Sequence, residues 1–231
     1  MVSRFFVLLL LTGVGAIFVS LMFGYVPDDA LNLTARYYAE NTVRDTGAAN
    51  IVTAIVVTFR GLDTLGEVTV LFLTAAIVGL VLAGSQQGRL RREQPAPGEL
   101  LVTGTRLLVP LTLLLGVYVF VNGHLTPGGG FQGGAILASA ILMLLLADPL
   151  REFSHRLISA IESISGLLFV AVGLLGMVYA GGFLDNRILP LGTLGDLISA
   201  GAIPVIYSFI GLKVGAEFSS MMVNLSETEE P

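Results

Sequence analysis

Two carboxylates and one guanidinium stand at helical spacing beside an apolar run. Asp63 and Glu67 are four residues apart, and Arg60 precedes Asp63 by three. A helix places side chains at these spacings on one face. Neighbouring carboxylates can share a proton or hold a cation in transit, and ionisable groups at membrane depth are functional candidates by default. Arg60, Asp63, Glu67 and the adjacent Thr64 are therefore the candidates for an ion path.

A plainer interpretation of the same residues stays open. Arg60 can neutralise Asp63 at the membrane interface, so that the charged stripe only anchors its helix. Helix geometry puts Glu67 about 10 Å from Arg60 along the axis, which is compatible with either role.

A second group of charges is predicted to be structural. Glu162 and Lys213 lie at matching ends of two apolar segments, and we expect them to form an ion pair. Lys213 and Glu217, at positions i and i+4 of one helix, are the alternative pair.

The most specific short stretch lies between two apolar runs, at residues 123–134, and reads GHLTPGGGFQGG. Each glycine costs a helix interior about 1 kcal/mol relative to alanine, so six glycines predict tight turns and close backbone approach instead. A lone histidine, His124, is weak evidence for a metal site. We interpret the stretch as a backbone-packing element between the helices expected at residues 101–121 and 131–147, at a subunit contact, with cation binding by its carbonyl groups as the minor alternative.

Composition places most of the chain in lipid. The 231 residues are 54% hydrophobic and 13% charged, with a mean hydropathy of +0.85. Soluble domains carry about 25% charged residues. The net charge of −5 does not favour a nucleic-acid partner, and the absence of cysteine excludes disulfides and thiolate-held metals. No nucleophile–base pair, phosphate loop or dinucleotide motif is present, so neither an enzyme nor a cofactor is predicted.

The apolar runs predict an all-α polytopic membrane protein. Six transmembrane helices are expected at residues 5–26, 60–83, 101–121, 131–147, 157–180 and 194–212. The run at residues 48–59 is shorter than the roughly 20 residues that a span requires. It is predicted to be a half-membrane helix or the leading part of a long bent one. The first run is too long for a signal peptide and lacks a cleavage site, so we expect a retained helix.

The basic residues predict that both termini are cytoplasmic. In that topology eight lie inside, three lie outside and Arg60 lies at the boundary, as the positive-inside rule favours. The inside group is Arg4, Arg89, Arg91, Arg92, Arg106, Arg151, Arg156 and Lys213, and the outside group is Arg36, Arg44 and Arg187.

Residues 85–100 interrupt the apolar pattern with glutamine, arginine and proline. Such a composition between apolar blocks is typical of a linker. We expect a membrane module at residues 1–84, a cytoplasmic linker at 85–100 and a second membrane module at 101–231.

The stretch at residues 123–134 resembles the signature loop of the B-type chain of Mrp-type multisubunit Na+/H+ antiporters, and the resemblance extends over about residues 101–224. It implies that Pro127 and Phe131 match loop residues associated with antiport. His124, Gly128, Gly129 and Gly130 are expected in the same subunit-contact loop.

The first part of the chain carries a second resemblance. Residues 48–67, with FRGLDTLGE at 59–67, are similar to the C-terminal end of the antiporter's A-type chain and to the E-type chain of membrane-bound hydrogenases. The resemblance implies that Asp63 and Glu67 match an acidic pair associated with the ion pathway. In many such antiporters this module ends a very long A-type chain, whereas here it is detached from one.

Together the resemblances imply a non-catalytic subunit of a multisubunit cation/proton antiporter in a prokaryotic cell membrane. The implied partners are antiporter-like subunits of the A and D types, small subunits of the C, E, F and G types, lipid, Na+ and H+, with a hydrogenase or ferredoxin-linked redox arm in some complexes. The alternative is a self-sufficient small-solute transporter, which would need internal repeats and a polar site at mid-depth.

Overall fold

A computed structural model describes residues 2–25, 30–85, 97–149 and 151–228. These ranges contain helices and no strands, which confirms the predicted all-α class. The chain divides into two compact units, residues 1–37 and 38–231, and each is described by itself. Residues 86–96 of the predicted linker, with Arg89, Arg91 and Arg92, lie outside the described residues.

The first unit contains α1 (Val2–Gly24) and the beginning of α2 (Leu33–Thr46). The apolar part of α1, from Arg4 to Gly24, buries none of its side chains within the first unit. A helix satisfies all its backbone hydrogen bonds internally, so such a segment is stable in lipid without further packing.

The run at residues 48–59 is helical and leads into the next long helix. It comprises α3 (Ile51–Thr53) and the π-helix η1 (Ala54–Phe59), and α4 (Gly61–Ser85) follows after a break at Arg60. A Cβ atom at Gly61 would lie 2.6 Å from the carbonyl oxygen of Phe183, so only glycine permits the packing there. The run is therefore helical as expected, and its half-membrane form stays a prediction.

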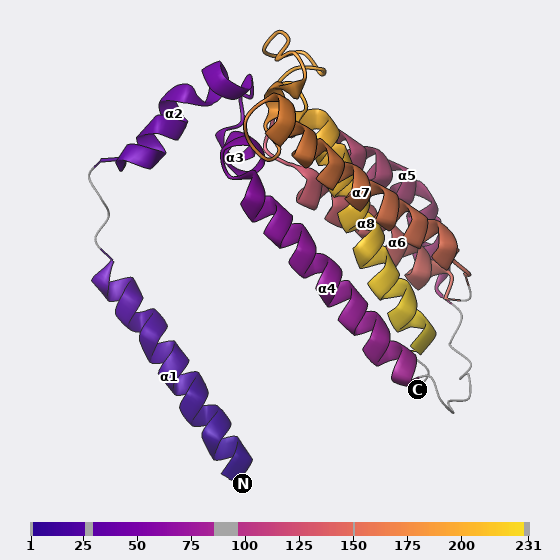
Figure 1. Ribbon diagram of the computed structural model, residues 1–231. Coiled ribbons are helices and arrows are strands. Elements are labelled where there is room, and N and C mark those ends of the chain that lie inside the picture. The colour runs from indigo at the N-terminus through magenta and orange to yellow at the C-terminus, as the bar shows by residue number, and fades with distance from the viewer. Residues whose placement is uncertain (1, 26–29, 86–96, 150, 229–231) are drawn as a thin grey trace. The chain divides into compact units, whose positions relative to one another are not determined.

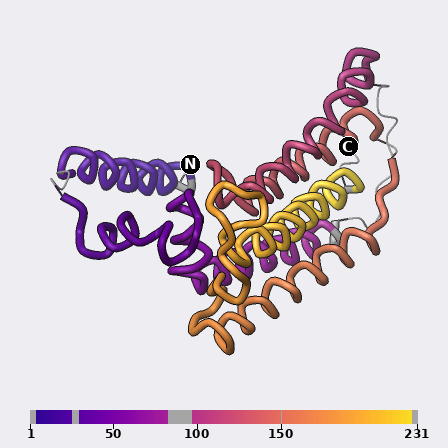
Figure 2. The backbone as a smooth tube through the Cα atoms, turned by 90° about the horizontal axis from the view of Figure 1, so that it is seen from above, coloured from indigo at the N-terminus to yellow at the C-terminus, as the bar shows by residue number. Residues whose placement is uncertain are grey.

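Four further helices complete the second unit: α5 (Glu99–Val121), α6 (Gly130–Ala147), α7 (His155–Tyr179) and α8 (Ile203–Thr228). Among the described residues, α1, α4, α5, α6 and α7 are long and apolar enough to cross a membrane. In Figures 1 and 2, α8 lies between α4, α7 and the α5–α6 pair, and it packs against all four.

The sixth predicted helix, at residues 194–212, had the wrong bounds. Turns occupy this region up to residue 202, and α8 runs from Ile203 to Thr228. Pro204 therefore lies in the first helical turn, where its missing N–H removes no helical hydrogen bond. The helix continues past Leu212 because its two buried charges, Lys213 and Glu217, form an ion pair with each other.

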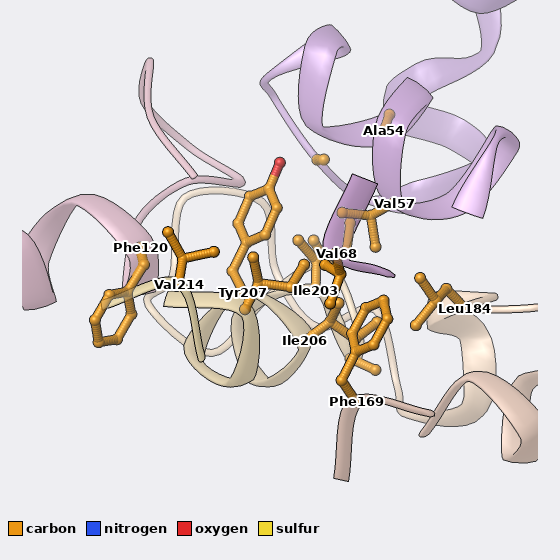
Figure 3. Close-up of a cluster of buried hydrophobic side chains, with 14 residues drawn as sticks. Ala54, Val57, Val68, Phe120, Phe169, Leu184, Ile203, Ile206, Tyr207 and Val214 are labelled. Carbon is orange, nitrogen blue, oxygen red and sulfur yellow. The ribbon is translucent and has the colours of Figure 1, made fainter. Parts of the chain in front are cut away.

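The core gathers around the first half of α8. Ile203, Ile206, Tyr207, Ile210 and Val214 are buried there against side chains of η1, α4, α5, α6 and α7. Figure 3 shows Tyr207 within this cluster, with its ring among the aliphatic side chains and its hydroxyl at the margin. The segment before α4 thus shares one core with the helices that follow the linker.

The connection between α7 and α8 is held by a buried asparagine. The Asn186 amide donates to the carbonyl oxygens of Thr46 at 2.7 Å and Ala200 at 2.9 Å, and its own oxygen accepts from Thr58 at 3.1 Å. Because these partners belong to segments distant in sequence, Asn186 ties the connection to the residues before α4.

Candidate functional site

The acidic stripe lies on the outer side of α4. Arg60 and Asp63 form an ion pair, and their side chains are 59% and 51% exposed. Glu67 is exposed on the same helix and has no ion-pair partner within the described part of the chain. The structure thus brings the three predicted charges to one surface of α4, which the described residues of the second unit leave exposed.

Thr64 belongs to the opposite side of the helix. It is buried, and its hydroxyl donates to the carbonyl oxygen of Val56 at 2.5 Å. That hydrogen bond crosses the break at Arg60 and fixes the angle between η1 and α4. Thr64 therefore positions the helix that carries Asp63 and Glu67.

The glycine-rich stretch forms the turn between α5 and α6 and the first turns of α6. Gly129 has φ 155° and ψ −175°, a backbone conformation that is essentially restricted to glycine. A Cβ atom at Gly130 would lie 2.5 Å from Cβ of Ile210, and one at Gly134 would lie 2.7 Å from Cβ of Val214. These glycines let α6 approach the backbone of α8, a helix other than the two that flank the stretch.

Pro127 and Phe131 occupy different environments within that stretch. Pro127 is exposed, whereas Phe131 is half-buried and packs on the core. Pro127 is thus the more exposed of the two residues. Gly128 is half-buried, and a Cβ atom there would lie 3.0 Å from the carbonyl oxygen of Val119.

Sequence reasoning missed the hydrogen bonds that join this stretch to the segment before α4. The Asn50 amide donates to the carbonyl oxygens of Gly123 at 2.9 Å and Thr126 at 3.0 Å. The Thr53 hydroxyl donates to Gly123 at 2.6 Å and accepts from Tyr207 at 3.0 Å. We call Asn50, Thr53, Gly123, Thr126 and Tyr207 the Asn50 cluster.

One sequence signal could have located part of this cluster. Asn50 directly precedes an apolar run, which is a helix N-cap pattern. Its side-chain oxygen accepts from the backbone N–H groups of Val52 and Thr53, as that pattern predicts. Its second role, toward a loop more than seventy residues away, leaves no local signal.

His124 is buried beside the cluster. Its Nε2 lies 3.3 Å from the carbonyl oxygen of Asp196, and its own carbonyl oxygen accepts from the backbone N–H groups of Ala49 and Asn50. Burial lowers the pKa of His124 below its ordinary value of 6.5, against the opposing effect of the Asp196 and Val121 carbonyls. The neutral imidazole is therefore the form that the fold favours.

The buried ion pair differs from the one expected first. Lys213 pairs with Glu217, whose Oε1 lies 2.7 Å from Nζ, and no ion pair joins Lys213 to Glu162 among the described residues. The reason is geometric, because one helical turn separates Lys213 from Glu217 while Glu162 lies on another helix. The alternative pair is the one that forms.

Comparison with known families separates the chain into two matched parts. Residues 100–220 match a domain related to the MnhB subunit of Na+/H+ antiporters, and residues 3–103 match the MbhE family, which is named for a component of MBH. The B-type chain of the Na+/H+ antiporter of Bacillus subtilis is 38% identical over 97 residues, which are 41% of this chain and 68% of that relative.

Two solved structures share the fold. A chain of the membrane-bound sulfane sulfur reductase, an archaeal respiratory membrane complex, is 39% identical with a TM-score of 0.82, covering 97% of this chain and 98% of that one. A chain of the Mrp complex from Dietzia is 29% identical with a TM-score of 0.79, covering 99% of this chain and 26% of that one. The resemblance noted in the sequence is confirmed. The protein is a multi-pass membrane protein and belongs to the family that carries a domain related to the MnhB subunit of Na+/H+ antiporters.

Proposed function

We propose that this chain is a non-catalytic membrane subunit of an Mrp-type Na+/H+ antiporter module, contributing to the ion path and to assembly of the complex. The observation that carries the proposal is the position of Asp63 and Glu67. Both are exposed on α4, whose apolar sequence is long enough to span a membrane. A carboxylate facing lipid costs a few kcal/mol, so these side chains require a polar neighbour.

A neighbouring subunit supplies that surface in the proposal. Asp63 and Glu67 then line a path between two chains, and Arg60 holds Asp63 at its entrance. Glu67 also acts electrostatically on the hydroxyl of Tyr207, a member of the Asn50 cluster.

The comparisons with solved structures support the proposed membrane complex as the place of this chain. Both solved neighbours are chains of complexes, the Mrp complex from Dietzia and an archaeal respiratory membrane complex, which favours a prokaryotic cell membrane. The redox-complex chain matches this one almost from end to end, whereas the Mrp chain contains the same fold within about a quarter of its length. We propose two modules in series, as at residues 1–84 and 101–231, serving either a stand-alone antiporter or a redox-driven complex.

The test neutralises the stripe without changing its shape. Asp63→Asn with Glu67→Gln, introduced into the intact complex, should abolish Na+/H+ antiport in membrane vesicles while the complex still assembles. Glu99→Gln, which removes an exposed carboxylate at the start of α5, is the matched control and should leave antiport unchanged. Full antiport in the double variant would overturn the ion-path assignment.

A further inference from the structure

The Lys213–Glu217 pair lies in the interior of the second unit. Both residues are in the middle of α8, and their side chains are 8% and 0% exposed. Helices α4, α5, α6 and α7 all pack on α8. A buried ion pair is often no more stable than an apolar pair of the same volume, so stability alone does not explain this one.

Only one half of the Glu217 carboxylate is satisfied. Oε1 accepts a hydrogen bond from Lys213, whereas Oε2 is buried without a hydrogen-bond partner in the described part of the protein. An ionised carboxylate oxygen buried without a donor is unfavourable by several kcal/mol. A proton on Oε2 would remove that charge.

Besides Glu217, Lys213 contacts two neighbouring helices. Its Nζ lies 4.9 Å from the ring centroid of Phe72 on α4, and aromatic faces attract cations. A Cβ atom at Gly166 of α7 would lie within 3.3–3.4 Å of Cδ, Cε and Nζ, so glycine makes room for the lysine chain. The ammonium thus bridges α4 and α7 and has little freedom to leave Glu217.

A second carboxylate, that of Glu162, gives the surroundings of the ion pair a net negative charge. Glu162, half-buried on α7, acts on Glu217 as a like charge, and Lys213 is the cation acting on Glu217.

The other helices packed on α8 carry few titratable side chains. Helix α6 carries none. Those of α4 and α5 are all exposed: Asp63 and Glu67 on α4, and Glu99, Arg106 and Tyr118 on α5. With every group ionised, the cluster of Lys213, Glu217 and Glu162 has two negative charges and one positive charge.

We propose that this cluster is a second proton-binding site, separate from the stripe on α4, in which Glu217 Oε2 binds and releases one proton while Lys213 remains an ammonium. Binding forms one O–H bond with a proton from water, and the cluster passes from one net negative charge to neutral. No electron or other group moves. A metal cation fits less well, because the ammonium already occupies the side of Oε1.

Infrared spectroscopy of the purified complex during a pH titration tests the proposal without relying on antiport. The wild type should show a carbonyl stretch of a buried protonated carboxylic acid that disappears as pH rises. Glu217→Gln should lack this band, and Glu99→Gln, which removes an exposed carboxylate, should retain it. An unchanged band in Glu217→Gln would overturn the assignment.

Two further variants keep the test decisive. Lys213→Met with Glu217→Met replaces the pair by apolar side chains of similar length, so the complex should assemble and still lack the band. Glu162→Gln removes the like charge, so the band should appear only at lower pH than in the wild type. A transition in Glu162→Gln at the wild-type pH, or at higher pH, would exclude the shared cluster. This infrared test does not involve Asp63 or Glu67, so the proposal of a second proton-binding site can be overturned while the antiport proposal stands.

Discussion

The Arg60–Asp63 pair and the Lys213–Glu217 pair each join a cation and a carboxylate within about one helical turn, in opposite surroundings. The first pair is 59% and 51% exposed, and the second is 8% and 0% exposed. Solvent or a neighbouring chain can rearrange around the first, whereas the fold fixes every neighbour of the second. The difference supports our proposal that a neighbouring subunit covers the stripe on α4, whereas the ion pair in α8 is enclosed by helices of this chain.

The largest effect on stability is expected from breaking the buried pair. Lys213→Met leaves the Glu217 carboxylate without its cation, which should destabilise the fold by about 3–5 kcal/mol. Lys213→Met with Glu217→Met should restore much of that loss. Thermal unfolding of the purified complex measures both variants. If the double variant is as unstable as the single one, the loss arises from packing rather than from the unpaired charge.

A smaller effect is expected where the signature loop meets α8. Gly130→Ala places a methyl group 2.5 Å from Cβ of Ile210, and overpacking of this kind costs about 1–3 kcal/mol. Gly104→Ala on α5 meets nothing within 4 Å, so it should be neutral or stabilising by up to about 1 kcal/mol. Denaturation midpoints of the two alanine variants provide the comparison, and equal midpoints would contradict the close approach of α6 to α8.

The buried histidine should make stability depend on pH. Because burial lowers the pKa of His124 below 6.5, the unfolded chain binds more protons than the folded chain between the lowered pKa and 6.5. The contribution of neutral His124 to the stability of the fold is therefore fully present above pH 6.5, and it is lost as the pH falls through that window. His124→Gln should flatten this part of a stability–pH curve. The same slope in His124→Gln would exclude His124 as its source.

The smallest effect is expected at the exposed pair. Arg60→Ala should change the unfolding free energy by no more than about 1 kcal/mol, because solvent-exposed ion pairs contribute little. Chemical denaturation of the purified complex measures this change. If Arg60→Ala lowered the unfolding free energy as much as Lys213→Met does, the two ion pairs would not differ in their contribution to stability.

Much of the fold could be predicted from local patterns. The apolar runs located α1 and α4–α7 to within a few residues, because lipid-facing helices carry a strong and continuous signal. The start of α8 was misplaced because Leu194, Leu197 and Ile198 look like a helical run, although they lie in turns. The tight connection that Asn186 holds depends on partners distant in sequence.

The candidate site was predictable in part for the same reason. Arg60, Asp63 and Glu67 share a helix face by spacing alone, so their association followed from the sequence. The direction in which that face points did not follow from the sequence, because it depends on how α4 packs on α8. The inward position of Thr64 and the unpartnered Oε2 of Glu217 are likewise products of tertiary packing.

Antiport by the intact complex carrying Asp63→Asn and Glu67→Gln tests most directly whether the outward-facing stripe serves the ion path. We predict an assembled complex with wild-type thermal stability and no Na+/H+ exchange. An assembled complex that exchanges Na+ for H+ at the wild-type rate would contradict that role.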